Sequence, residues 1–485
     1  MKMLIDGKWV DASDGKTMDI RNPGTREVIG QVPRATLQDV ERAVAAAQNG
    51  KRGMRRLTAH ERFSIMIRIA QAIEAGVPEL GKLLAQENGK PILQTRAEVG
   101  VTANIFRGFA EETKRIFGRV MPVDAVSGQE RHFAMTIRQP LGVVAAIVPF
   151  NYPVELWGHK AAAALAAGNA LISKPPSACP LTLLKIAELM EQAGLPAAAH
   201  QILTGPGAVI GDCLARSPGV QLITVTGSTA VGIRIAELAA QNLKKVHMEL
   251  GGNDAMIILA DSDVEKAVEA VVLGRLARGN GQICCAVKRI YVEAPIYDDF
   301  AKRLTERARA LKVGDQLQED TDVGPLISEE AAMEIEASVN EAIKGGAKLT
   351  AGGHRRQAFM EPTVLTEVPA DLPTFKEEVF GPVAPLVRFK TVEEAIRMAN
   401  DSPYGLQSAV FTRDINKALE IAYKLEAGGV IINWSSALRV ETLPFGGIKM
   451  SGHGREGIHD TLDEMTDQKT IVVHNAFGPK GPDAG

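Results

Sequence analysis

Residues 142–148, GVVAAIV, decide the fold of this 485-residue chain. An unbroken apolar run of this length is typical of a parallel strand that is buried on both faces of its sheet. Helical and strand-like segments alternate after it, in the order ELWGHKAAAALAAG, NALISK, CPLTLLKIAELMEQAG, HQILTG, QLITVTG and STAVGIRIAELAAQN. Because βαβ units join parallel strands by right-handed crossovers, this alternation predicts an α/β domain of the dinucleotide-binding type.

The rest of the chain is organised around this series. Residues 1–35 have the pattern of short strands and turns, and residues 37–117 have the spacing of amphipathic helices. A second alternating series, from DAMIILA to IINW at residue 434, predicts another α/β domain. Further strand-like segments lie at residues 132–138 and 469–474.

Composition excludes several classes of protein. Apolar residues make up 45% of the chain and charged residues 23%, which is typical of a globular protein rather than a disordered or fibrous one. The 55 Lys and Arg residues against 58 Asp and Glu residues give a net charge of −3, so no basic field exists to attract nucleic acid or an anionic membrane. The longest apolar stretches are shorter than the ~20 residues that a membrane span needs.

Cysteine and histidine usage indicates the compartment and the absence of a metal centre. The four cysteines, two of them adjacent, argue against a disulfide scaffold and favour a reducing environment. The N-terminus lacks the continuous apolar segment of a secretory signal, so we expect a cytoplasmic protein. Histidines and cysteines do not cluster at ligand spacings, so we expect no metal site.

The strongest local signal for chemistry is GQICC, in which Cys284 follows the glycine-containing loop ARGNGQ. A cysteine becomes a nucleophile when a neighbouring base or charge favours its thiolate, and glycine allows the close backbone approach that exposes it. The alternative is that the adjacent Cys284 and Cys285 fill a core as small apolar residues.

Two further polar residues follow strand-like segments. Glu249, in MELGGND, lies among apolar residues and glycines, where a carboxyl group with a raised pKa would serve as a general base; it could instead cap the following turn. Asn151, in VPFNYP, lies at the carboxyl end of the buried strand, and its amide could donate to an oxyanion or only form the turn. In TVTGSTAVG, a serine at a helix start offers a phosphate site.

The order and spacing of these motifs resemble those of the NAD(P)-dependent aldehyde dehydrogenase superfamily over nearly the whole chain. The matching motifs are PFNYP with Asn151, SKPPS with Lys174, GSTAVG, MELGG with Glu249, GQICC with Cys284, EEVFGP with Glu378, and LPFGGIKMSGHGREG at residues 443–457. The chain looks most like the branch that includes lactaldehyde, succinate semialdehyde, non-phosphorylating glyceraldehyde-3-phosphate and phosphonoacetaldehyde dehydrogenases.

The resemblance implies a covalent mechanism. Cys284 matches the family nucleophile, which attacks the aldehyde carbon to give a thiohemiacetal, while the Asn151 amide and the Cys284 N–H stabilise the oxyanion. Hydride transfer to the nicotinamide leaves a thioester, which water activated by Glu249 hydrolyses. Cys285 matches a position with no chemical role.

The resemblance also implies a site for NAD or NADP. Lys174 and Glu378 match positions that hold the two riboses. Ser228 matches the pyrophosphate side and Phe380 the nicotinamide side. The other residues matched to the cofactor site are Val148, Pro149, Phe150, Ser177, Gly207, Gly211, Gly227, Val231 and Leu250. Ser177 stands where strictly NAD-using relatives often carry a glutamate that repels a 2′-phosphate, so NADP use is permitted but not required.

Family members fold as a cofactor domain, a catalytic domain and a small oligomerisation arm. We therefore expect an α/β protein with two Rossmann-type parallel-sheet domains, in which residues 1–117 and 138–249 bind the cofactor and residues 250–434 carry the nucleophile. Residues 118–137 and 465–485 are expected to form the arm of a homodimer or homotetramer.

The expected substrate funnel differs from that of relatives that oxidise apolar aldehydes, which tend to line it with aromatic residues. The matched positions here are Arg107, Tyr152, His159, Ile283, Arg439 and Phe445. Two arginines and a histidine converging on one pocket favour a short anionic or hydroxylated aldehyde, because a guanidinium binds carboxylate, phosphate or sulfonate in a bidentate way. The alternative is that Arg107 and Arg439 form salt bridges at a surface or a subunit interface.

Other functions remain open to a chain with this cysteine. A CoA-acylating dehydrogenase would pass the acyl group to a thiol, but such relatives usually lack the carboxylate that Glu249 provides. A dehydrogenase for neutral or aromatic aldehydes would use the same residues with a different funnel. A cofactor-free cysteine hydrolase would need a histidine paired with Cys284, and none of the nine histidines lies in a recognisable context for it.

Overall fold

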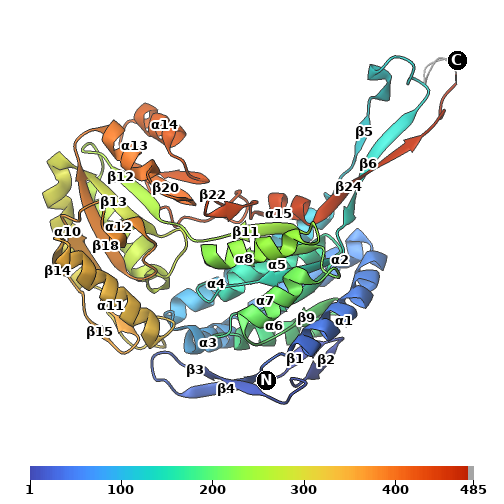
Figure 1. The fold of residues 1–485 in the computed structure, drawn as a ribbon, viewed down its shortest axis with the longest axis horizontal. Helices are drawn as coiled ribbons and strands as arrows, with labels where there is room; N and C mark the ends of the chain where they lie inside the picture. Colours follow the sequence, from blue (N-terminus) through green and yellow to red (C-terminus); the bar gives the residue numbers. More distant parts are fainter. Residues whose placement is uncertain (479–485) are drawn as a thin grey trace.

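The computed structural model describes residues 1–478, in which two large sheets lie side by side and a narrow three-stranded sheet projects from the first (Figure 1). The first sheet has eight strands in the order β2-β1-β9-β8-β7-β10-β11-β23. Its middle strands run parallel: β7 (Val143–Ile147), β8 (Ala170–Lys174), β9 (His200–Ile202), β10 (Leu222–Thr226) and β11 (Lys245–Glu249). The strand predicted from residues 142–148 is confirmed as the buried centre of this sheet.

Helices join these parallel strands, as the alternating pattern predicts. They are α5 (Pro153–Ala166), α6 (Leu181–Gln192), α7 (Gly207–Arg216) and α8 (Thr229–Ala240). Antiparallel strands close the two edges: β1 (Met3–Ile5) and β2 (Lys8–Val10) on one side and β23 (Gly452–His453) on the other. A hairpin of β3 (Thr17–Arg21) and β4 (Val28–Pro33) lies near the N-terminus.

The helical block predicted for residues 37–117 is confirmed. Its members are α1 (Leu37–Arg56), α2 (Ala59–Ala75), α3 (Val77–Asn88) and α4 (Ile92–Thr113). Capping boxes start α1 and α2, where the side chains of Thr36 and Thr58 accept hydrogen bonds from backbone N–H groups of the first turn. Because α4 packs against both α2 and α5, this block supports the start of α5, which follows Asn151.

The second sheet has seven strands in the order β14-β17-β18-β13-β12-β20-β21. Its strands are β12 (Asp254–Ile258), β13 (Val287–Glu293), β14 (Lys348–Ala351), β17 (Thr363–Thr366), β18 (Val383–Phe389), β20 (Gln407–Phe411) and β21 (Gly429–Ile432). All neighbouring pairs are parallel except β14 with β17. The longer helices around it are α9 (Val264–Val271), α10 (Tyr297–Arg309), α11 (Glu329–Lys344), α13 (Val392–Asn400) and α14 (Ile415–Lys424).

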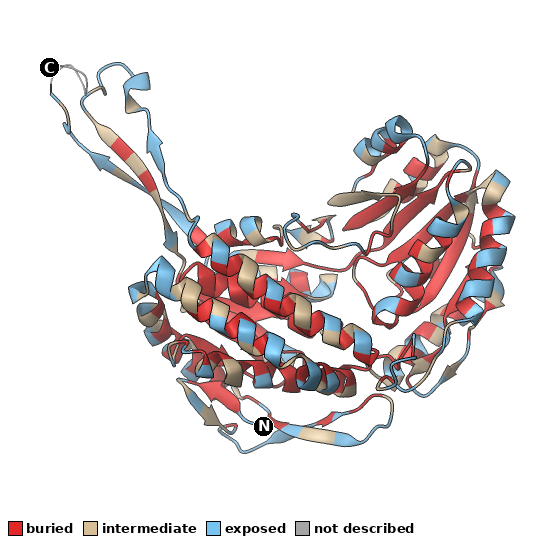
Figure 2. Cartoon of the chain, turned by 180° about the vertical axis from the view of Figure 1, so that it is seen from behind, coloured by how far each residue is buried: buried red, intermediate tan, exposed pale blue. Residues whose placement is uncertain are grey.

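The third sheet consists of β5 (Arg119–Met121), β6 (Phe133–Pro140) and β24 (Thr466–Val473) in the order β24-β6-β5. It extends away from the rest of the molecule, and its outer strands are mostly exposed (Figure 2). The segments predicted to form the arm are therefore paired, although β6 continues to Pro140. Residues 479–485 of the predicted arm lie outside the described residues.

Burial follows the two large sheets, whose strands are largely buried beneath helices with exposed outer faces (Figure 2). The apolar residues of β7 and β8 divide between two clusters, one on each face of the first sheet. Within residues 1–478, no helix combines the length and the apolarity that a membrane crossing requires.

Candidate active site

The residues expected to perform chemistry lie where the two large sheets meet. Asn151 follows β7, Glu249 is the last residue of β11, and Cys284 precedes β13 of the second sheet. A cavity of about 30 Å³ has among its lining residues both Asn151 and Cys284, together with Tyr152, Arg278 and others. The structure thus brings together side chains that are far apart in the sequence.

The loop before Cys284 has an unusual backbone. Gly279, Asn280 and Gly281 have φ angles of 58°, 55° and 73°, in the left-handed region that favours glycine. A Cβ atom at Gly281 would lie 2.5 Å from the carbonyl carbon of Gly381, so only glycine fits there. Asn280 is held in the same conformation because its side-chain amide donates to the carbonyl oxygens of Gly89 and Pro325. This loop fixes where Cys284 enters the cavity.

The groups around the Cys284 thiol shift its pKa in opposite directions. A hydrogen bond with Cys285 and burial both raise the pKa of the Cys284 thiol well above its ordinary value, whereas the charges of Lys288 and Arg439 lower it. The thiol is therefore protonated at neutral pH in this structure, and it needs a base to become a nucleophile.

Glu249 is a buried carboxyl group without partners. It is 1% exposed, and neither carboxyl oxygen has a hydrogen-bond partner within residues 1–478. Burial raises the pKa of Glu249 well above its ordinary value, and negative charge on Cys284 raises it further. A carboxyl group with a raised pKa binds a proton more readily than an exposed one, and this property suits a general base.

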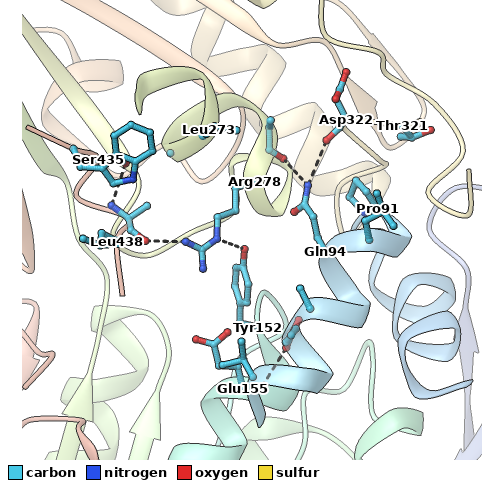
Figure 3. Close-up of a pocket in the computed structure, with 18 of the residues that line it drawn as sticks. Pro91, Gln94, Tyr152, Glu155, Leu273, Arg278, Thr321, Asp322, Ser435 and Leu438 are labelled. Carbon is cyan, nitrogen blue, oxygen red and sulfur yellow. Dashed lines mark hydrogen bonds between the residues drawn. The ribbon is translucent and has the colours of Figure 1, made fainter. Parts of the chain in front are cut away.

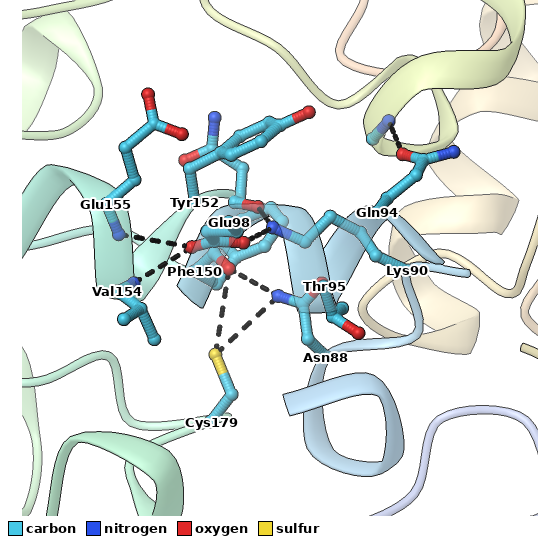
Figure 4. A network of polar contacts seen from close by, with 12 residues as sticks. Asn88, Lys90, Gln94, Thr95, Glu98, Phe150, Tyr152, Val154, Glu155 and Cys179 are labelled. Atoms are coloured by element: carbon cyan, nitrogen blue, oxygen red, sulfur yellow. Dashed lines mark hydrogen bonds and ion pairs between the residues drawn. The ribbon is translucent and has the colours of Figure 1, made fainter. Parts of the chain in front are cut away.

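A buried ion pair holds the turn that carries Asn151 (Figure 4). Lys90, between α3 and α4, forms an ion pair with Glu98 and donates to the backbone oxygen of Asn151 at 2.5 Å. Glu98 also accepts hydrogen bonds from the N–H groups of Val154 at 2.9 Å and Glu155 at 3.3 Å, and so caps α5. The Asn151 side chain is buried, and its Oδ1 has no hydrogen-bond partner in the described residues.

Arg278 connects this cavity to a larger one of about 470 Å³ that opens between α4 and the second sheet (Figure 3). It follows α9 and a π-helical segment, Val272–Ala277, a local winding that often accompanies functional sites. Its Nε donates to the Tyr152 hydroxyl at 3.2 Å and a terminal nitrogen donates to the Ala437 oxygen at 2.9 Å. No carboxylate lies within ion-pair distance of it in the described residues, so its charge is available to a ligand.

Three residues expected in the substrate funnel are placed differently. Arg107 forms an ion pair with Glu74 and lines neither cavity, because it lies on another face of α4 than Gln94 and Val101. His159 is fully buried, with no partner for either ring nitrogen among the described residues, and it also lines neither cavity. Phe445 lies behind the cavity wall. Arg107, His159 and Phe445 therefore lie outside the walls of both cavities, and their contact with a substrate stays a prediction.

Arg439 does line the small cavity, but its charge is already engaged. A terminal nitrogen lies 2.7 Å from the Glu456 carboxylate, its Nε lies 4.0 Å from that of Glu155, and its guanidinium stacks 4.5 Å from the centre of the Phe445 ring. The sequence alternative in which Arg439 forms salt bridges thus matches its contacts, although within the site rather than at a surface. Ile283 and Tyr152 contribute to the cavity wall as expected.

The residues expected to bind the cofactor surround the carboxyl ends of the first sheet. Lys174 Nζ donates to the Ser177 hydroxyl at 3.2 Å, and burial lowers the pKa of Lys174 to about 8. Ser228 caps α8. Phe150, Glu378 and Phe380 line a cavity of about 580 Å³. The remaining expected residues lie along this edge, with Val148 and Pro149 after β7, Gly207 and Gly211 in α7, Gly227 after β10, Val231 in α8 and Leu250 after β11.

Comparison with known proteins identifies the family. The family model described as aldehyde dehydrogenase family matches residues 9–471. The chain belongs to the aldehyde dehydrogenase family. Its relatives include the 3-sulfolactaldehyde dehydrogenase of Priestia aryabhattai, 40% identical over 97% of this chain and 98% of that protein, and the lactaldehyde dehydrogenase of Methanocaldococcus jannaschii, 41% identical over 97% of this chain and 100% of that protein.

Solved structures of this family share the fold. An NADP-dependent enzyme from E. coli superposes with a TM-score of 0.95 at 37% identity, covering 98% of both chains. The fold class and the enzyme class that the aldehyde dehydrogenase motifs predict are therefore confirmed.

The sequence reasoning missed two residues of the site. Arg278 lies in the quoted loop ARGNGQ, so a search for charged residues just before the cysteine would have found it. Lys90 has a weaker signal, because a lysine in a loop between helices is normally exposed.

Proposed function

We propose that the protein oxidises a short aldehyde with an anionic or hydroxylated tail to the carboxylic acid, with NAD or NADP as hydride acceptor. The observation that carries the proposal is a single cavity lined by a nucleophile, an oxyanion donor and a guanidinium without a carboxylate partner, namely Cys284, Asn151 and Arg278. The 3-sulfolactaldehyde and lactaldehyde dehydrogenases among its relatives support this substrate class.

In the proposed reaction, Cys284 loses its proton to a water molecule in the cavity, and the thiolate attacks the aldehyde carbon. A C–S bond forms while the C=O π bond opens to an oxyanion. The Asn151 amide and the backbone N–H of Cys284 donate hydrogen bonds to that oxyanion. A nicotinamide held beside Phe150 and Phe380 would supply the hydride acceptor, and loss of hydride from the same carbon would leave a thioester on Cys284.

Glu249 completes the cycle. Its carboxylate takes a proton from water, the resulting hydroxide equivalent attacks the thioester carbon, and the C–S bond breaks to release the acid and regenerate the thiol. The unpartnered, buried carboxyl group supports this role, since it has a raised pKa and no competing hydrogen bond in the described residues. The same carboxyl group counts against transfer of the acyl group to CoA.

The residues present fit a dinucleotide. The first turn of α8 offers free N–H groups beside Ser228 for a pyrophosphate. A Cβ atom at Gly251 would lie 2.4 Å from Glu378 Oε2, so the glycine leaves space for that carboxylate to hold a ribose. Lys174 lies next to Ser177 rather than next to a carboxylate, an arrangement that supports acceptance of a 2′-phosphate and hence of NADP as well as NAD.

A substrate panel tests the proposal. Initial rates of cofactor reduction are measured for succinate semialdehyde and sulfolactaldehyde against propanal and benzaldehyde, with the wild type and with Arg278→Met. We expect kcat/KM for the anions to fall about 100-fold in the variant, as for loss of a buried charge-assisted contact of about 3 kcal/mol, with little change for neutral aldehydes. Arg107→Met is the matched control and should change neither.

Two outcomes of the panel would overturn the assignment of an anionic tail. The first is a wild-type preference for neutral or aromatic aldehydes. The second is an equal loss for every aldehyde in Arg278→Met, which would assign the guanidinium a structural role through Tyr152 and Ala437.

We also propose assembly and location. Exposed apolar side chains on the projecting sheet, including Val120, Met121, Val472 and Val473, support a homodimer or homotetramer formed through this arm. Light scattering of the wild type against a variant with Val472 and Val473 replaced by Ser tests it, and an unchanged mass would contradict it. A cytoplasmic location suits a catalytic thiol that must stay reduced.

A further inference from the structure

Lys288, on β13, is a buried lysine that the mechanism above does not use. Its side chain is 1% exposed, and its Nζ lies 2.8 Å from Glu378 Oε1. The same nitrogen donates to the backbone oxygen of Cys284 and lies 5.8 Å from the centre of the Phe380 ring. The Lys288 ammonium therefore contacts the backbone of Cys284 and two residues, Glu378 and Phe380, that line the cavity expected to hold the cofactor.

Two glycines, Gly251 and Gly252, make room for the groups that contact this ammonium. Gly252 donates its N–H to Glu378 Oε1 at 3.3 Å, and a Cβ atom at Gly252 would lie 2.9 Å from the Cys284 oxygen. Together with Gly251, this glycine lets the Glu378 carboxylate and the Cys284 carbonyl approach one lysine from two sides. A buried ammonium remains charged only when such partners surround it, and two of its three hydrogens are accounted for here.

We propose that Lys288 is a positioning residue that fixes Glu378 and the Cys284 loop relative to each other, so that occupancy of the cofactor site is coupled to the reactivity of the thiol. The proposal rests on the proposed role of Glu378 in cofactor binding. A ligand that binds Glu378 alters the ion pair between Glu378 and the Lys288 ammonium. The Lys288 side chain then transmits this change to the backbone oxygen of Cys284. Such coupling is reciprocal, since thermodynamic linkage requires each site to affect the other equally.

The charged groups that face the thiol come from several elements. Negative charge comes from Glu249 on β11, and positive charge comes from Lys288 on β13 and from Arg439 in the loop after β21, while Cys285 is the adjacent thiol. Around Lys288 itself the carboxyl groups are those of Glu378 and of Asp254 on β12, and burial raises the pKa of Asp254 well above its ordinary value. Removal of Lys288 thus takes away a cation near the thiol, where Arg439 and Arg278 remain, and it also removes the ion-pair partner of Glu378.

Two measurements without any aldehyde test the proposal. The first is the dissociation constant of NADH and NADPH, followed by protein fluorescence. The second is the rate of Cys284 alkylation by iodoacetamide across neutral to alkaline pH, with and without NAD or NADP. For Lys288→Met we expect cofactor affinity to fall about tenfold or more, the alkylation midpoint to move to higher pH, and the effect of cofactor on alkylation to be lost.

Control variants separate positioning from folding. Lys288→Arg keeps the positive charge, so its cofactor affinity and its alkylation midpoint should lie between those of Lys288→Met and those of the wild type. Glu378→Gln keeps the side-chain shape and removes a negative charge, so it should weaken cofactor binding but move the alkylation midpoint to lower pH, the opposite direction from Lys288→Met. Lys244→Met removes another buried ammonium, which donates to the carbonyl oxygens of Ser217 and Val220 at the far end of β11, and should change neither readout.

The proposal is overturned if Lys288→Met unfolds like the wild type yet binds cofactor and alkylates like it, or if Lys244→Met produces the same losses. It is also overturned if Glu378→Gln and Lys288→Met shift the alkylation midpoint in the same direction. Should Lys288→Met fail to fold, a Glu378→Gln midpoint at or above that of the wild type overturns the proposal instead. Because neither readout involves an aldehyde, failure here is distinct from failure of the proposed substrate or reaction.

Discussion

Replacement of Lys90 by Met separates the stability of the site from its chemistry. The substitution keeps the length of the side chain but leaves the Glu98 carboxylate, which is 0% exposed at the side chain, without its ion-pair partner. Loss of one partner of a buried pair costs about 3–5 kcal/mol. The Asn151 backbone oxygen also loses its donor, so the oxyanion amide is held less firmly.

The magnitude expected for the rate has an upper bound. Complete removal of an oxyanion donor costs about 10²–10³ in kcat, and a displaced Asn151 should cost a part of that, with little change in cofactor affinity. The double variant Lys90→Met with Glu98→Gln removes both charges, while the amide oxygen of the new side chain can still cap α5, so it should recover most of the stability. It should not recover kcat, because the Asn151 oxygen still lacks the ammonium.

Urea unfolding and steady-state kinetics on the wild type, both single variants and the double variant check this reasoning. Recovery of kcat together with stability would refute a positioning role for Lys90, since it would mean that the rate loss came from general loosening. A Lys90→Met variant that resists urea as well as the wild type would refute the stabilising role of the ion pair between Lys90 and Glu98.

Other expected outcomes follow from the buried groups. Glu249→Gln should slow thioester hydrolysis about 10²–10⁴-fold while sparing hydride transfer, which stopped-flow absorbance would record as a full burst of reduced cofactor followed by a slow steady state; a missing burst would contradict it. Burial lowers the pKa of Lys174 to about 8, so the ammonium loses its charge as the pH rises through that value. NADP affinity should therefore fall over this range more than NAD affinity. In binding titrations, Lys174→Gln should abolish this difference in pH dependence between the two cofactors. Burial lowers the pKa of His200 from 6.5 to about 3, so between these values the unfolded chain binds a proton that the folded chain does not. Stability should therefore decrease as the pH falls from 6.5 towards 3. The melting temperature of His200→Gln should depend less on pH over this range.

The sequence predicted those features of the fold that depend on local patterns. Continuous apolar runs such as residues 142–148 mark the parallel strands, since a strand covered on both faces has no polar side. Capping residues such as Thr36 and Thr58 mark where helices start. The paired third sheet could be inferred only from the family resemblance, because β6 and β24 join parts of the chain that are far apart in sequence.

The candidate site was predictable where a residue lies at or near the carboxyl end of a parallel strand. Asn151 lies shortly after β7 and Glu249 is the last residue of β11, and the parallel arrangement brings these two strand ends to one edge. The ion pair of Arg107 with Glu74 could not be foreseen, because spacing along α4 does not reveal which helix face meets the cavity. Arg439 does reach the cavity, but the carboxylates of Glu155 and Glu456 that neutralise it come from other segments, and only the fold brings them together.

The most direct test of the central claim is reduction of NAD or NADP by wild-type enzyme and by Cys284→Ala, with sulfolactaldehyde or succinate semialdehyde as substrate. The account predicts rapid reduction by the wild type and none by the variant, with cofactor affinity preserved in both. Dehydrogenase activity retained by Cys284→Ala would contradict it, because no other thiol in residues 1–478 lies where it could replace Cys284 beside Asn151 and Arg278, except the adjacent and buried Cys285.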